Sequence, residues 1–158
     1  ALTLACHPSE TEERMMVRLL AFALHADDAL AFGRGLSSED EPDVARRDPT
    51  GAIDLWIDVG LPDERELRKA CARSREVQLY AYGGRTCALW WKKAGPALAR
   101  LVPLAVHEVP QEASRGLAEL ARRTMRLPCT IQDGHVFVSD GERSVSVELR
   151  TLKAMGAG

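Results

Sequence analysis

The chain has 158 residues, a length typical of a single domain, so a two-domain enzyme with an interdomain cleft is not expected. Hydrophobic residues make up 46% and charged residues 28% of the chain, a mixture that excludes both a membrane-embedded and an intrinsically disordered protein. The net charge of −2 argues against a dedicated nonspecific DNA-binding protein, because such proteins usually carry a clear positive excess.

The start of the chain bears on localisation. No signal-peptide pattern is present, and no apolar stretch reaches the roughly 18 residues of a membrane span, so we predict a cytoplasmic protein. The chain begins at Ala1 inside an apolar run rather than at a methionine. We therefore expect the start of the protein to be missing.

The first predicted element is an amphipathic helix that begins near Ser9 or Thr11, either of which can cap it. Apolar residues recur at helical spacing from Met15 to Leu24, and the pattern fades before Gly33. Residues 37–48 are polar and acidic, contain Pro42 and are predicted to form a loop.

A strand is predicted over 53–59, where apolar and other residues alternate strictly. Gly60 and Pro62 end this strand and open a helix that runs to about Ser74, and a second strand follows over 76–82. Strand, helix and strand with short connections predict a right-handed parallel crossover.

The second half continues this alternation and then changes character. A helix is predicted over 85–101, disturbed near Gly95, followed by a strand over 104–109 and a helix over 111–125. Short strands over 130–132, 135–138 and 144–149, separated by two Asp-Gly turns, predict a small antiparallel meander. The fold class is therefore α/β, with a mixed sheet flanked by helices and a C-terminal β meander in a single domain.

Two acids of the strand over 53–59 are the first candidates for chemistry. Asp54 and Asp58 share one face of the strand near its carboxyl end, where α/β sheets tend to place ligands. The alternative is that this face is wet and both acids are simply solvated. Residues four apart along a strand are separated by about 13 Å, so both cannot ligate one small cation unless the strand bulges or twists.

Charged residues of the first two helices are further candidates. Glu13 lies in line with Met16 and Leu20, which predicts that it points toward the sheet, although a first-turn glutamate often serves only the helix dipole. Arg65, Arg68, Lys69 and Arg73 recur at helical spacing and could hold phosphate oxygens. Five positive and four negative charges over 63–76 favour instead a solvated, self-paired surface.

The sequence offers little support for other common metal, nucleotide-binding or nucleophilic sites. The four histidines show no two-ligand spacing, and no Walker loop, dinucleotide fingerprint or nucleophile elbow is present. Trp90 and Trp91 could stack on a base, but aromatic residues in an apolar helix more often belong to the core.

Four runs in the same order, over 7–20, 40–43, 53–64 and 130–134, closely resemble the YaeQ family of bacterial proteins. Members of that family begin with an additional stretch of strand-forming sequence, which agrees with the expectation that the start of the chain is missing. The resemblance implies a variant of the restriction-endonuclease-like fold, whose nucleases carry a Pro-Asp and Asp/Glu-x-Lys signature. It also implies an association with transcription elongation. On that interpretation, the transcription machinery would be a binding partner and the protein would not be catalytic.

The resemblance implies specific roles for four residues. Glu13 would be the helix acid and Asp54 and Asp58 the strand acids that hold a divalent metal such as Mg²⁺. Gly60 stands where the signature has lysine, so either Lys69 reaches back from the following helix to complete the catalytic set, or catalysis has been lost.

Two further positions depart from the family. Asp58 stands where the family usually has glutamate, and Ala45 where it more often has tryptophan. Two hypotheses follow from the whole sequence: an Mg²⁺-dependent phosphodiesterase related to nucleases, or a noncatalytic module that binds nucleic acid or the transcription machinery. The retained acids favour the first, and the missing lysine and the acidic net charge favour the second.

Overall fold

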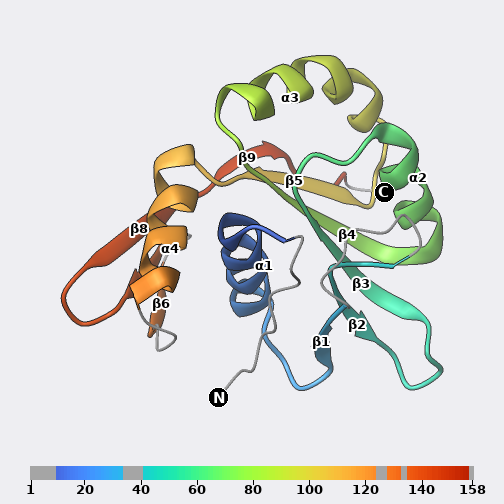
Figure 1. Ribbon diagram of the computed structural model, residues 1–158. Coiled ribbons are helices and arrows are strands. Elements are labelled where there is room, and N and C mark those ends of the chain that lie inside the picture. The colour runs from blue at the N-terminus through green and yellow to red at the C-terminus, as the bar shows by residue number, and fades with distance from the viewer. Residues whose placement is uncertain (1–9, 34–40, 124–127, 133–134, 157–158) are drawn as a thin grey trace.

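The computed structural model describes residues 10–33, 41–123, 128–132 and 135–156. The chain forms a six-stranded mixed sheet with helices on both faces and a separate three-stranded antiparallel sheet (Figure 1). The predicted α/β class with a C-terminal β meander is confirmed at this level. None of the helices in the described ranges is long and apolar enough to cross a membrane.

Helix α1 (Glu12–Leu24) begins where the sequence predicts. Thr11 caps it, because its hydroxyl oxygen accepts a hydrogen bond of 3.1 Å from the backbone amide of Arg14. Ser9, the other predicted cap, lies outside the described residues. Met16, Val17 and Leu20 are buried, so the apolar stripe faces the sheet as expected.

The first half of the main sheet is an antiparallel meander. Strand β1 (Leu30–Phe32) pairs with β2 (Val44–Arg47), and β2 pairs with β3 (Ile53–Val59). Residues 37–40 of the predicted loop lie outside the described residues, and the prediction is wrong over 44–47, which form β2. Val44 is fully buried there, so pairing with β3 and burial of this side chain outweigh the strand's two arginines and its acidic flanks.

Parallel strands form the centre of the sheet. Helix α2 (Glu64–Arg73) connects β3 to β4 (Ser74–Ala81), and α3 (Arg85–Leu98) connects β4 to β5 (Leu104–Glu108). Both strand pairs are parallel, as the short connections predict. Helix α3 continues through Gly95 and Pro96, where the sequence predicts a disturbance.

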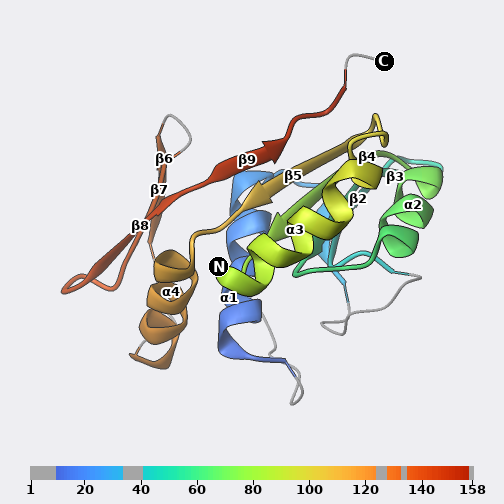
Figure 2. The same cartoon turned by 90° about the horizontal axis from the view of Figure 1, so that it is seen from above.

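The chain ends with α4 (Gln111–Arg123), the three-stranded sheet and a last strand. Strands β6 (Cys129–Gln132), β7 (His135–Ser139) and β8 (Ser144–Glu148) form the predicted meander. Strand β9 (Arg150–Lys153) is not predicted from the sequence; it returns to the main sheet and pairs with β5 (Figure 2).

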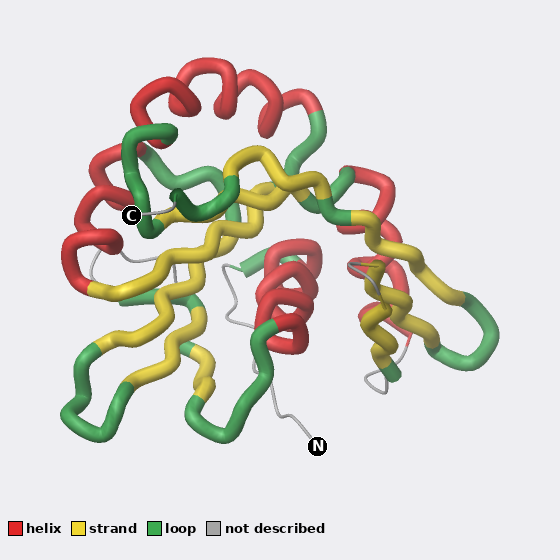
Figure 3. Tube along the Cα trace, turned by 180° about the vertical axis from the view of Figure 1, so that it is seen from behind, coloured by secondary structure: helices red, strands yellow, loops and turns green. Residues whose placement is uncertain are grey.

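Two hydrophobic cores lie on opposite faces of the main sheet. Helix α1 packs on one face together with α4 and the three-stranded sheet, whereas α2 and α3 cover the other face (Figure 3). In β3, Leu55 and Ile57 point into the first core and Trp56 into the second. The face of β3 that carries Asp54 and Asp58 is therefore largely covered rather than wet, and Trp56 is only 1% exposed.

Candidate functional site

Two acidic residues meet at the carboxyl end of β3. Asp43 directly precedes β2, and the antiparallel register that pairs Val44 with Ile57 brings it beside Asp58. The backbone amide of Asp43 donates to Oδ1 of Asp58 over 3.4 Å. The carboxyl ends of parallel strands are the usual position of ligand sites in α/β sheets, so this pair is the natural centre of a candidate site.

Both oxygens of the Asp43 carboxylate already have partners. Oδ1 accepts a hydrogen bond of 2.7 Å from Nη2 of Arg14, and Oδ2 accepts one of 2.9 Å from the backbone amide of Val59. The side chain is 4% exposed. The first of these contacts ties β2 to α1 and the second ties it to β3, so Asp43 also joins three elements.

Arg14 belongs to a chain of largely buried charges that runs from Glu10, just before α1, into the first turns of that helix. Its Nη1 lies 2.7 Å from Oε2 of Glu10, and Nη2 of Arg18 lies 2.8 Å from the other oxygen of the same carboxylate. The side chains of Glu10 and Arg18 are each 1% exposed. Buried ions are tolerated only when they are paired, and two arginines here compensate the acids of the candidate site.

The two acids of the site differ in their ionisation. The pKa of Asp58 is raised to about 7, chiefly by burial and also by the nearby charges of Asp43 and Glu66, whereas the Trp56 indole opposes the rise. Burial also raises the pKa of Asp43, although Arg14 opposes this effect. We infer that Asp43 carries the negative charge, because it has the arginine, and that Asp58 is partly protonated at neutral pH.

The residues proposed from the sequence have separate partners. Oε2 of Glu13 accepts a hydrogen bond of 2.5 Å from Oγ of Ser114 on α4. Asp54 pairs with Arg46, whose Nε lies 3.1 Å from Oδ2 of the aspartate. Asp58 contacts Asp43, and Lys69 lies half-buried on α2.

These positions bear on the expected metal. In the part of the chain that the structure describes, no group of three histidine, cysteine, aspartate or glutamate residues is placed to hold a metal ion. Both oxygens of Asp43 are engaged, and Gly60, two residues after Asp58, stands where the nuclease signature implied by the family resemblance would have lysine. In this arrangement, the residues do not fit a resident divalent cation.

Sequence reasoning missed Asp43 and Arg14 as members of the site. A signal was present in the sequence, because Pro42 and Asp43 form a Pro-Asp pair like the one that the family resemblance leads one to expect. Assigning residues 37–48 to a loop concealed it, since an aspartate in a loop has no fixed position relative to β3. Once β2 is recognised, its antiparallel pairing with β3 places Asp43 beside Asp58.

A second polar cluster lies on the α1 side of the sheet. The hydroxyl of Tyr80 is 2.6 Å from Nε2 of His25, and Nε2 of His107 is 2.8 Å from Oε1 of Gln78. The rings of Tyr80 and His107 stack with centroids 5.0 Å apart. Burial lowers the pKa of both histidines, and Tyr80 is only 3% exposed, so this cluster is part of the core rather than an open site.

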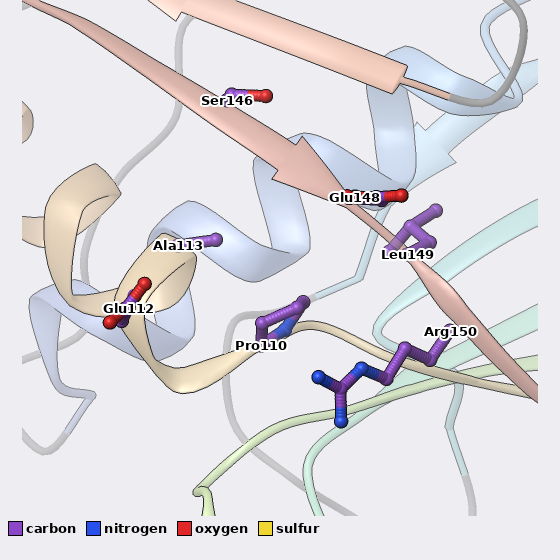
Figure 4. Close-up of a pocket in the computed structure, with 7 residues that line it drawn as sticks. All are labelled: Pro110, Glu112, Ala113, Ser146, Glu148, Leu149 and Arg150. Carbon is purple, nitrogen blue, oxygen red and sulfur yellow. The ribbon is translucent and has the colours of Figure 1, made fainter.

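A hollow of about 400 Å³ lies elsewhere, between the start of α4 and strands β8 and β9 (Figure 4). Pro110, Glu112, Glu148 and Arg150 are among its lining residues. Neither Asp43 nor any of the four residues proposed from the sequence lines it. It is therefore separate from the acidic pair.

Known proteins resemble this chain in both sequence and overall fold. The family model described as "YaeQ protein" matches residues 1–149 of the chain. The chain belongs to the YaeQ family. An uncharacterized YaeQ protein of Salmonella typhi is 47% identical over 149 residues, which are 94% of this chain and 82% of that protein. The Escherichia coli K12 YaeQ protein, also uncharacterized, is 44% identical over the same shares of the two chains.

Two crystal structures of YaeQ proteins share the fold. The protein from Xanthomonas axonopodis pv. citri superposes with a TM-score of 0.91 at 54% identity, covering 97% of this chain and 86% of the other. The protein from Pseudomonas syringae gives a TM-score of 0.89 at 39% identity, with coverages of 97% and 84%. The mixed sheet and its flanking helices are therefore those of the YaeQ family.

Proposed function

We propose that this YaeQ protein is a nucleic-acid-binding domain that keeps a restriction-endonuclease-like fold but does not hydrolyse its ligand. The observation that carries the proposal is the distribution of charge. Residues 77–107 contain four basic residues and no acidic one, while the whole chain has a net charge of −2. The rest of the chain therefore carries a net charge of −6, so the weak overall charge conceals a strongly positive segment.

The order of elements supports nucleic acid as the ligand. Helix α1, the three antiparallel strands β1 to β3, helix α2 and the parallel strand β4 resemble the core that restriction-endonuclease-like proteins use. On this proposal, the Pro-Asp pair before β2 and Asp58 near the end of β3 would correspond to acids of the signature of that fold. Fold resemblance alone does not assign activity, so the site must decide whether catalysis is retained.

The site argues against hydrolysis. Metal-assisted cleavage of a phosphodiester needs clustered oxygens that are free to bind a hard cation, together with a cation near the attacking water. Here the guanidinium of Arg14 holds Asp43, and glycine replaces the signature lysine. Arg14 supplies the positive charge that a metal ion supplies in the nucleases of this fold.

The proposal is tested by measuring binding and cleavage together. The chain is incubated with duplex DNA, single-stranded DNA and RNA, in EDTA and then with Mg²⁺ or Mn²⁺, and the mixtures are resolved on native and denaturing gels. We expect the nucleic acid to be retarded on native gels and to remain intact. Absence of retardation for every ligand would overturn the proposal.

A second candidate is the Mg²⁺-dependent phosphodiesterase with Glu13, Asp54, Asp58 and Lys69 as its working residues. The observation that favours it is the contact between Asp43 and Asp58, two acids of the kind that hold a metal in nucleases. This function requires Arg14 to release Asp43 when the metal binds. Metal-dependent cleavage that is lost in Asp58→Ala and retained in a surface variant such as Glu119→Ala would establish it in place of the first proposal.

A further inference from the structure

The basic segment is displayed on the outer side of α3. This helix covers the face of the sheet opposite to α1 (Figures 1 and 2). Its inward side includes Cys87 and Leu98, which are fully buried. Its outward side has no other described element packed over it in Figures 1 and 2, and Arg85, Lys92 and Lys93 are all exposed.

The spacing of the outward residues makes them one surface. Arg85, Leu89, Lys92 and Pro96 follow each other at intervals of four, three and four residues, which places them along one stripe of a helix. Lys93 borders this stripe, and Arg100 extends it just beyond the end of the helix. Arg85 and Lys92 are separated by about 10 Å along the helix axis. We call Arg85, Lys92, Lys93 and Arg100 the outer basic face.

The cations of the outer basic face are not neutralised by any acid in residues 10–33, 41–123, 128–132 and 135–156. In the described parts of the chain, no acidic side chain forms an ion pair with any of these four residues. Helix α2 differs, because its Arg68 pairs with Glu64 one turn earlier. A row of unpaired cations with no acid among them is suited to a polyanion rather than to a protein surface of mixed charge.

Nucleic acid fits this face better than a lipid membrane does. Helices that lie in a membrane surface bury a continuous apolar face between the lipids. Within α3, all of which is described, Leu89 is the only large hydrophobic side chain that is exposed, while the apolar side of the helix packs on the sheet. The face can therefore contact a row of phosphates but offers little apolar surface to acyl chains.

We infer that the outer basic face binds the phosphate backbone of nucleic acid without reading its sequence. This inference rests on the proposed function and deepens it, because it names the surface and the mode of contact. It separates binding from the acidic pair of Asp43 and Asp58, which belongs to a different part of the sheet. Backbone binding of this kind is electrostatic, so affinity should fall steeply with salt and depend little on base sequence.

The experiment compares the wild-type chain with two matched charge reversals. Lys92→Glu/Lys93→Glu alters the outer basic face, and Arg115→Glu/Arg143→Glu makes the same change of charge on α4 and near β8. Fluorescence anisotropy is recorded with labelled duplexes and single strands of about 20 nucleotides in several sequences, a length that offers more phosphates than four cations can contact. Circular dichroism checks that each variant is folded.

We expect Lys92→Glu/Lys93→Glu to bind every nucleic acid at least about tenfold more weakly, because two phosphate contacts are replaced by repulsion. The control pair should bind within about twofold of the wild-type chain, since its charges lie outside the face. In the neutral variant Lys92→Gln/Lys93→Gln, the slope of log affinity against log salt for duplex DNA should fall by about 2.

Three outcomes would overturn the inference, and they have different meanings. Equal binding by Lys92→Glu/Lys93→Glu and the wild-type chain would place the contact elsewhere and leave the proposed function intact. No binding by the wild-type chain would overturn both. Binding only to vesicles that contain phosphatidylserine, measured by co-sedimentation, would identify the face as a lipid contact instead.

Discussion

Asp58 is held in a place where its charge is unfavourable. Burial and the neighbouring Asp43 raise its pKa to about 7, whereas an aspartate in the unfolded chain has a value near 3.8. The folded state therefore binds this proton more tightly than the unfolded state. The resulting penalty is absent at pH values below about 3.8, grows as the pH rises toward 7 and is complete above that value.

Asp58→Asn should consequently stabilise the protein at alkaline pH. Asparagine keeps an oxygen that can accept from the Asp43 amide but carries no charge to bury. We expect the free energy of unfolding at pH 8 to rise by at least about 1 kcal/mol, with a gain that shrinks toward pH 4. Urea titrations at both pH values measure this difference.

A competing pH effect and a control variant must be considered in this measurement. Burial lowers the pKa values of His25 and His107, so these residues destabilise the folded state as the pH falls below about 6.5. This effect is the same in the wild-type chain and in Asp58→Asn, so it cancels in the comparison. Asp54→Asn is the matched control, because Asp54 is on the same strand, is 33% exposed and pairs with Arg46. If Asp58→Asn changed the free energy of unfolding by the same amount at pH 4 and pH 8, the Asp58 carboxyl would have to ionise as easily in the folded chain as in the unfolded chain.

The same residues show how far a sequence can specify a site. The sequence identified Asp58 and its neighbourhood, because strict alternation over 53–59 fixes which residues share a face of β3. It could not identify Asp43 as the partner, because no local pattern reveals the pairing of two strands. The four proposed site residues remain proposals, and the hydrogen bond at the end of β3 joins Asp58 to Asp43 rather than to any of the other three.

At the scale of elements, the position of Asp43 depends on how closely the end of β1 approaches the residues before β2. The amide of Gly33, at the end of β1, donates to the carbonyl oxygen of Asp43 over 2.7 Å. A Cβ atom on Gly33 would lie 2.3 Å from the carbonyl oxygen of Pro42. Glycine is required here by the close approach of two backbones.

Gly33→Ala should therefore destabilise the protein by about 1–3 kcal/mol, because backbone rather than a mobile side chain would have to move. The displaced segment includes Asp43, so the pKa of Asp58 should fall toward its ordinary value in the same variant. Thermal unfolding measures the first effect, and carboxyl chemical shifts in an NMR pH titration measure the second.

Gly156→Ala is the control for this substitution. The Cβ atom it adds would lie 3.4 Å from a methyl group of Val102, which is an ordinary contact. We expect its melting temperature to stay close to that of the wild-type chain. Equal stability of the two alanine variants would contradict the role assigned to Gly33.

The long elements follow from periodicity, whereas three short strands of the main sheet do not. Helices α1 to α4 and strands β3 to β5 carry enough residues for a repeat to be visible. Strands β1, β2 and β9 have only three or four residues each, and their neighbours in the sheet rather than their own sequence hold them in place. The two short strands β1 and β2 are the ones that bring Asp43 to the site.

At the scale of the whole molecule, two cores share one sheet. The first core includes Val136, Val138 and Val147 of the three-stranded sheet, so that sheet is packed against the same residues as α1 and α4. The second core contains Trp56, with Trp90 and Trp91 packed against it. All three tryptophans of the chain therefore report on the face opposite to the three-stranded sheet.

This arrangement predicts that the two cores unfold together. Val147→Ala removes two methyl groups from a fully buried position in the first core and should lower the free energy of unfolding by about 1–3 kcal/mol. Tryptophan fluorescence and far-ultraviolet circular dichroism should shift by the same amount in urea. A fluorescence transition that is unchanged would mean that the three-stranded sheet unfolds independently.

The distribution of charge is also a property of the whole molecule. The acid-free segment 77–107 is visible in the sequence, but the net charge of −2 for the whole chain does not reveal it. The fold turns the segment into a surface, because α3 buries its apolar side on the sheet and leaves its cations outside. The prediction of salt-dependent binding made for the outer basic face depends on that step.

The sequence by itself determined the α/β class, the parallel crossovers, the C-terminal β meander and membership of the YaeQ family. These features follow from the repeat of apolar residues along the chain and from long matching runs, and both are local in sequence. Only the tertiary structure decided that Arg14 neutralises Asp43, that Asp58 lies half-buried beside it and that the cations of α3 face outward. Each of these facts depends on contacts between residues far apart in the chain, and their energies arise from burial and charge pairing that no single segment contains.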